Sequence, residues 1–192
     1  MTTGIKNKAE LILALLFAGD QEFPTSIEGI TRLEKLIFLL KEEKGFLKEK
    51  TDEDNFNFIP FKMGPWSSEV YDEVDFLESL GLINKDSNEK QSPADEAHND
   101  ELFDSMILDK YQKESLVFSD ERTEIFKLTE KGKKKAKQIW DRLPKEEQEK
   151  IISVKKKFNT MNLKQFLRYV YKKHPEYTTA SEIKEYLGIR EK

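Results

Sequence analysis

The sequence predicts an α+β fold that is mostly α-helical, and three observations lead to this prediction. Apolar residues recur at helical spacing in several segments, each bounded by residues that commonly begin or end helices. Short aromatic and aliphatic runs near residues 56–61 and 125–128 have the composition of β-strands. The 192 residues include no cysteine, so the core must form without a disulfide framework.

The charge and hydropathy of the chain argue against two classes of protein, nucleic-acid binders and membrane-spanning proteins. Charged residues make up 36% of the chain and the net charge is −4, which gives no overall nucleic-acid signature. No apolar run approaches the roughly 20 residues of a membrane span. We therefore expect a cytoplasmic protein that contacts no membrane.

The first two helices should supply much of the core. Residues 6–18 are apolar nearly all round, which is typical of a central buried helix. Thr31 should begin the second helix, because Glu34 follows it at capping-box spacing. Gly45 then provides a stop signal.

Residues 58–83 read as a strand, a turn, a helix and the start of another strand. Phe58 and Phe61 favour the strand, and Pro60 places it at a sheet edge. Gly64-Pro65 should form a tight turn, because glycine accepts positive φ and proline fixes φ near −65°. Ser67 is then a suitable N-cap for the third helix.

The third helix has two distinct faces, and Gly81 should end it. Its apolar face is formed by Val70, Val74, Leu77 and Leu80. Its other face is acidic, formed by Glu69, Asp72, Glu73, Asp75 and Glu78. This acidic face is either an ordinary solvated surface or a surface for a protein partner.

The remaining segments complete two predicted regions. Residues 1–143 should form the main domain, with a mobile acidic insertion at about 85–113. Residues 116–118 and 125–128 should pair as an antiparallel hairpin. Thr129 caps a basic helix over 130–143, and residues 144–192 form a C-terminal helical extension packed on the domain. This extension includes a terminal helix with a capping-box pattern at Thr179 and Glu182.

The order of these elements resembles a winged helix. The run 126–136, Phe-Lys-Leu-Thr-Glu-Lys-Gly-Lys-Lys-Lys-Ala, resembles the end of a wing and the helix behind it. The Leu-Glu-Lys-Leu helix at 33–36, the turn at 61–69 and Gly-Leu-Ile at 81–83 resemble the SocA/Panacea-type antitoxin domain and the related YwgA-like proteins. That resemblance implies a helical domain with a small sheet that binds other proteins. The insertion departs from the usual antitoxin pattern.

No catalytic constellation is evident, and we expect neither an enzyme nor a bound cofactor or metal. His98 and His174 lie far apart in sequence, and the glycine of Lys131-Gly132-Lys133 lacks the context of a phosphate-binding loop. We therefore expect a protein-interaction module, antitoxin-like or adaptor, whose partner is a protein such as a toxin or a protease substrate. The expected partner-binding residues are Trp66, Glu69, Asp72, Glu73 and Met63.

Two alternatives stay open. A winged-helix transcriptional regulator would bind DNA through the wing and the following basic helix. Its binding residues would be Arg122, Lys131, Lys133, Lys134, Lys135 and Lys137, extended by Arg142 and Lys155–Lys157. A homo-oligomer would instead join the basic region of one protomer to the acidic helix or insertion of another, and salt would weaken it.

Overall fold

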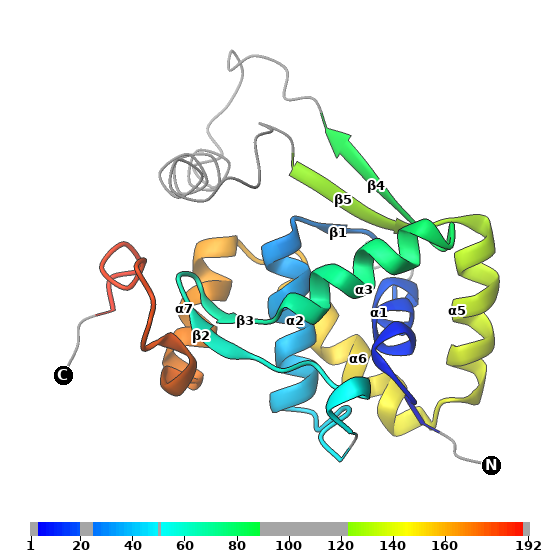
Figure 1. The fold of residues 1–192 in the computed structure, drawn as a ribbon, viewed down its shortest axis with the longest axis horizontal. Helices are drawn as coiled ribbons and strands as arrows, with labels where there is room; N and C mark the ends of the chain where they lie inside the picture. Colours follow the sequence, from blue (N-terminus) through cyan, green and yellow to red (C-terminus); the bar gives the residue numbers. More distant parts are fainter. Residues whose placement is uncertain (1–3, 20–24, 50, 89–122, 190–192) are drawn as a thin grey trace.

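The computed structural model describes residues 4–19, 25–49, 51–88 and 123–189. Its architecture is α+β, with helices packed beside one three-stranded antiparallel sheet and one two-stranded sheet (Figure 1). The elements in chain order are α1 (Lys8–Phe17), β1 (Ile27–Glu28), α2 (Ile30–Glu42), η1 (Asp52–Asp54), β2 (Ile59–Phe61), β3 (Gly64–Trp66), α3 (Ser68–Ser79), β4 (Ile83–Asn88), β5 (Thr123–Leu128), α5 (Glu130–Arg142), α6 (Lys145–Phe158), α7 (Leu163–Lys173) and η2 (Pro175–Thr178). No helix in these ranges is long and apolar enough to cross a membrane.

The predicted central helix is confirmed. In α1, the side chains from Leu11 to Leu16 are at most 2% exposed. In Figure 1, α1 and α2 lie in the middle of the molecule, with α5 on the right and α7 on the left. The core around them includes Phe126 of β5 and Phe166 of α7, so it extends across both regions that the sequence separated.

The start of α2 differs from the prediction. Gly29, with φ of 83°, is the N-cap, and no side chain caps this end of the helix. Thr31 lies inside the first turn, and the Glu34 side chain is 2% exposed instead of turning back to the helix end. The capping-box prediction is therefore wrong, because Glu34 serves a contact with a distant segment, described below.

The turn before α3 lies two residues earlier than predicted. β2 and β3 pair antiparallel with Phe61 opposite Gly64, which leaves Lys62 and Met63 to form the turn. Gly64 lies within β3, has φ of 89°, and a Cβ there would come 2.8 Å from Tyr171. Glycine is thus required both by the backbone conformation and by the close approach of α7.

The three-stranded sheet has the order β1-β5-β4, and all its pairings are antiparallel. β5 pairs with β4 along its whole length and with β1 at Ile125 and Phe126. The predicted partner strand, 116–118, lies outside the described residues. β4 continues to Asn88, so regular structure extends past residue 85, where the insertion was expected to begin. The rest of the predicted insertion is outside the described residues.

The C-terminal region packs against the hairpin. Glu182 donates its backbone N–H to the Lys62 carbonyl at 2.9 Å, and the Ser181 hydroxyl donates to the same carbonyl at 3.2 Å. The Tyr171 hydroxyl of α7 lies 2.7 Å from that of Ser181. Residues 179–189 form turns, so the helix predicted after Thr179 is wrong. Contacts with the hairpin overrule the local capping pattern.

Candidate functional site

The β2–β3 hairpin presents large apolar side chains to solvent. Ile59 is 49% exposed and Phe61 is 43% exposed, although most side chains of this type are buried elsewhere. Phe61 lies on Trp66 with ring centroids 5.1 Å apart, and Trp66 lies 6.2 Å from the ring of Tyr71 in α3. Ile59 and Phe61 are two residues apart in β2, so their side chains lie on the same face of the strand. Trp66 lies opposite Ile59 in the pairing, so it shares this face, and it is half-buried.

A buried ion pair in α2 holds the end of the hairpin in place. Lys35 Nζ bonds to Glu34 Oε2 and donates to the Pro65 carbonyl at 2.8 Å. Glu34 Oε1 accepts the backbone N–H of Ser67 at 3.1 Å. The two charged side chains are 1% and 2% exposed. Burial raises the pKa of Glu34, while the adjacent Lys35 ammonium opposes that rise. We call Glu34, Lys35 and their two backbone partners the latch.

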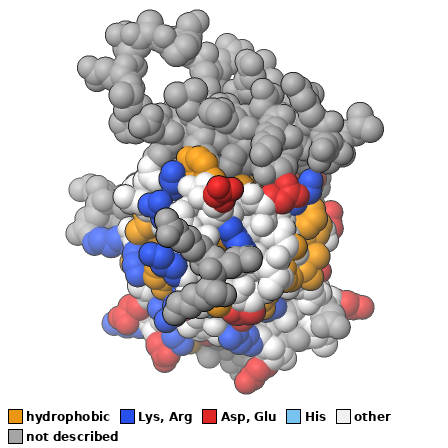
Figure 2. Space-filling model, turned by 90° about the vertical axis from the view of Figure 1, so that its left-hand side faces the viewer, with side chains coloured by type: hydrophobic (Ala, Val, Ile, Leu, Met, Phe, Trp, Pro, Cys, Tyr) orange, Lys and Arg blue, Asp and Glu red, His pale blue; other side chains and the backbone are white. Residues whose placement is uncertain are grey.

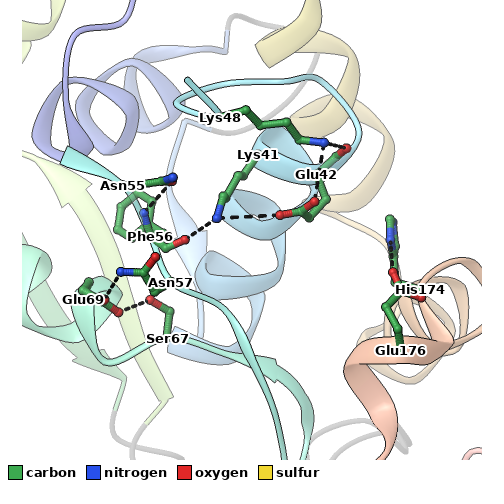
Figure 3. Close-up of polar contacts among 10 residues, drawn as sticks. All are labelled: Lys41, Glu42, Lys48, Asn55, Phe56, Asn57, Ser67, Glu69, His174 and Glu176. Atoms are coloured by element: carbon green, nitrogen blue, oxygen red, sulfur yellow. Dashed lines mark hydrogen bonds and ion pairs between the residues drawn. The ribbon is translucent and has the colours of Figure 1, made fainter. Parts of the chain in front are cut away.

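The start of α3 is fixed by a second set of polar contacts (Figure 3). Ser67 is the N-cap as predicted, but its hydroxyl donates to Glu69 at 2.6 Å instead of capping the backbone. Asn57 donates to the other oxygen of Glu69 at 3.1 Å. Burial raises the pKa of Glu69, but these hydrogen bonds outweigh it and the net pKa is lowered. On the neighbouring α2, Lys41 donates to the Phe56 carbonyl at 2.6 Å, which anchors the chain before β2.

The acidic residues of α3 do not form one uniform face. Glu69 is engaged as described, and Glu73 is partly buried, which raises its pKa although Lys8 opposes the rise. Asp72 is exposed, and no ion pair is recorded for it among the described residues. Of the acidic residues predicted to bind a partner, Asp72 is exposed, whereas Glu69 and Glu73 are partly buried. Met63, at the hairpin turn, is partly buried against the core.

A second acidic group lies near the C-terminal half of α3. Lys85 of β4 forms ion pairs with Asp75 and with Glu78, the latter at 3.0 Å. Glu124 of β5 is nearby: burial raises its pKa, Lys85 lowers it, and the charges of Glu78 and Asp75 raise it further. One lysine thus serves several carboxylates, and the local charge stays negative.

The predicted basic residues are also divided. Lys133 pairs with Glu130 at 2.7 Å and Lys137 pairs with Asp141 at 2.6 Å. Lys155 is fully buried, so its predicted place in a nucleic-acid surface is wrong. Arg142 is partly buried and pairs with Glu10 of α1. Arg122 lies outside the described residues.

The other lysines of α5 border a shallow hollow of about 380 Å³ beside the end of α3. Its lining is formed by Leu80, Leu82, Lys131, Lys134, Lys135 and Gln138. Lys131 donates to the Leu80 carbonyl at 2.8 Å, which joins the two helices. For Lys134 and Lys135, no ion pair is recorded among the described residues. The structure therefore brings Lys131, Lys134 and Lys135 together and leaves Lys133 and Lys137 on another face.

Sequence reasoning missed several residues that matter here. Glu34 was assigned to a cap, and Lys35 was treated only as part of a motif. Exposed Ile59 was not singled out, and Phe76, 53% exposed, was overlooked among the acidic residues of its helix. His174 is the C-cap of α7, and in addition its Nε2 lies 3.1 Å from Glu43 and joins α7 to α2.

Figure 2 views the side of the molecule that carries the hairpin and α7 in Figure 1. Apolar side chains reach this surface in separate places among Lys, Arg, Asp and Glu side chains. Such a mixed surface favours no single polyanionic ligand. No family model, curated protein or solved structure matches the chain.

Proposed function

We propose that this chain is a non-enzymatic protein-interaction module that binds a protein partner through the hairpin and the start of α3. The carrying observation is the exposure of Ile59 and Phe61 beside half-buried Trp66 on one face of the hairpin. Exposed apolar side chains grouped on one element mark interaction surfaces, and tryptophan is a frequent energetic anchor in them. We call Ile59, Phe61, Trp66 and Asp72 the hairpin surface.

The latch supports this proposal because it presents the hairpin surface on a rigid base. Lys35 and Glu34 fix the backbone on both sides of Trp66, at Pro65 and Ser67. A surface that is already ordered loses little conformational entropy on binding. The same pair explains how the two sequence motifs work together. The Leu-Glu-Lys-Leu helix supplies the charged side chains, and the Gly-Pro-Trp-Ser segment supplies the backbone groups that they bind.

The partner should offer an apolar side chain with basic residues beside it. Asp72 is exposed and has no ion pair with a described residue, so it would favour a lysine or arginine at the rim of the contact. An antitoxin-like or adaptor role, with a toxin or a protease substrate as partner, follows from the resemblance to the SocA/Panacea-type domain.

A winged-helix-like assignment is consistent with a sheet of order β1-β5-β4 in which β1 lies between α1 and α2 and the pair β4–β5 follows α3. Under this assignment α3 occupies the recognition position. Its charged residues, however, are all acidic, and DNA affinity comes largely from Lys and Arg on phosphates. This arrangement supports a protein partner for α3 more than DNA.

DNA binding through α5 is the second candidate. It is favoured by Lys131, Lys134 and Lys135, which gather on one side of that helix. Filter binding to random duplex at two salt concentrations tests it. Tight, steeply salt-dependent binding that is lost in K134E/K135E would support this candidate and count against a protein-only role.

The proposed function is tested by affinity capture of the tagged chain from its native host, followed by mass spectrometry. We expect a stoichiometric protein partner that is lost in I59S/F61S. The matched control is Tyr186→Ser, because Tyr186 is 42% exposed and belongs to the C-terminal region. Capture that survives I59S/F61S, or that is lost equally in the control, would contradict the proposal.

A further inference from the structure

The lysines of α5 fall into two classes. Lys133 and Lys137 are neutralised within the helix by Glu130 and Asp141. Lys134 and Lys135 form no recorded ion pair with a described residue, and both border the hollow beside α3. The positive charge of this helix is therefore concentrated at the hollow, where it is available to an acidic group from another molecule.

The floor of the hollow is apolar. Leu80 and Leu82 form it, and Leu80 is 42% exposed. An apolar floor with a lysine rim fits a large apolar side chain flanked by carboxylates. It fits a bare phosphate backbone less well, because phosphate oxygens have no apolar group to bury against leucine.

The same molecule carries a matching projection. Phe76 is 53% exposed on α3, one helical turn before Leu80 and on the same side of the helix. Asp75 and Glu78 flank it and share one lysine, Lys85, so this pair of carboxylates keeps a net negative charge, and Asp75 is 71% exposed. Phe76 with these two carboxylates has the shape and charge that the hollow would accept.

We propose that two copies of this chain associate through a two-fold contact in which Phe76 of each copy enters the hollow of the other. Asp75 and Glu78 of one copy would then face Lys134 and Lys135 of its partner. A second copy is the favoured occupant because projection and hollow adjoin at Leu80, and a two-fold axis satisfies both at once. This contact would also cover two large apolar side chains that are now open to solvent.

The self-association surface and the hairpin surface use different parts of α3. The helix spans 12 residues, about 18 Å at 1.5 Å per residue, and the hairpin precedes its first turn. A dimer of this kind would leave Ile59 and Phe61, which precede α3, outside the contact, although Asp72 lies one helical turn before Phe76. The inference therefore stands or falls independently of the proposed function.

Sedimentation velocity of the full chain over a range of concentrations tests the proposal. We expect the mass to rise from 22.6 kDa toward twice that value as concentration increases. Salt should weaken the association, since exposed charges are screened within about 3 Å at 1 M. A chain that stays monomeric at every concentration in low salt would overturn the proposal.

Charge reversal identifies the surface. K134E/K135E and D75K/E78K should each remain monomeric, and mixing these two variants should restore dimers of one copy of each. K133E/K137E is the matched control: it reverses the same number of charges on the other side of α5 and should associate like the unmodified chain. Equal loss in K133E/K137E, or no recovery in the mixture of folded variants, would overturn the assignment.

Discussion

At the scale of single residues, Lys155 is the most unusual side chain. Its ammonium is fully buried on α6 and donates to the carbonyls of Leu15, Leu16 and Thr25, at 2.7, 3.3 and 2.6 Å. The first two carbonyls belong to the last turn of α1, where backbone acceptors lack helical partners. Lys155 of α6 therefore caps the C-terminal end of α1. Burial lowers its pKa from 10.5 to about 7.

This lowered pKa predicts how stability depends on pH. Between pH 7 and 10 the unfolded chain binds a proton at this lysine that the folded chain does not, so stability should rise with pH in that window. The slope from this one group is at most about 1.4 kcal/mol per pH unit.

Urea titrations of the unmodified chain and of Lys155→Met, at several pH values, measure this effect. The variant has no titrating group at position 155. The unfolding free energy of the unmodified chain minus that of the variant should therefore increase from pH 7 to pH 10. Comparing the two proteins cancels the other titrating groups. A difference that stays constant over this range would show that Lys155 remains charged in the folded state.

Trp66 and Phe61 should respond differently to truncation. Trp66 is half-buried between Phe61 and Tyr71, so Trp66→Ala should lower the unfolding free energy by about 2 kcal/mol. Phe61→Ala removes an exposed ring and should cost less than about 1 kcal/mol. Thermal unfolding followed by circular dichroism measures both. Equal costs would place Phe61 in the core and remove it from the hairpin surface.

At the scale of elements, the latch joins α2 to the hairpin through one buried ion pair. Removing a single partner of such a pair leaves an uncompensated buried charge, which typically costs 3–5 kcal/mol. Lys35→Met should therefore be strongly destabilising. Glu34→Gln/Lys35→Met removes both charges while keeping an acceptor for the Ser67 amide, so we expect it to be more stable than Lys35→Met alone. A double-mutant cycle by chemical denaturation measures the coupling.

The stability of the double variant relative to Lys35→Met also measures the cost of leaving Glu34 buried without its lysine. If the double variant is no more stable than Lys35→Met, the carboxyl of Glu34 that remains in Lys35→Met costs little, because burial raises its pKa and it takes up a proton once the lysine is gone. Hydrogen exchange of the Ser67 amide provides an independent reading. It should accelerate in any variant that frees the hairpin from α2.

The elements also show what the sequence could predict. Apolar spacing located most helices, and the local signal at Thr129 was confirmed, since its side chain accepts the amide bond expected of an N-cap. The signal at Glu34 failed because a distant amide, that of Ser67, competes for its carboxylate. The signal at Thr179 failed because the following backbone bonds to the hairpin. Local patterns cannot reveal such long-range competitors.

The candidate site was predicted less completely than the fold. The sequence indicated an acidic α3 and the Trp66 segment, but exposure separates Asp72 from the partly buried Glu69 and Glu73. The division of the α5 lysines likewise depends on which ones meet carboxylates in space. The sequence gives the charge of each side chain but not its burial or its ion-pair partners, so it does not distinguish among these residues.

At the scale of the whole molecule, the two predicted regions share one core. Residues from α6 and α7, including Phe158 and Phe166, belong to the same buried cluster as α1 and α2. Arg32 of α2 also donates to the carbonyls of Phe158 and Met161, at 2.9 and 2.7 Å. These contacts join residues 144–192 to the rest of the chain as closely as neighbouring helices join within a domain.

We therefore expect the described parts of the chain to unfold in a single cooperative transition. Calorimetry should give equal calorimetric and van't Hoff enthalpies, the mark of two-state unfolding in a single domain. A fragment of residues 1–143 should fail to fold, because it would expose the α1 and α2 surfaces that α6 and α7 cover and lose the Lys155 cap on α1. Two separated transitions, or a folded fragment, would instead show that residues 1–143 fold without the C-terminal region.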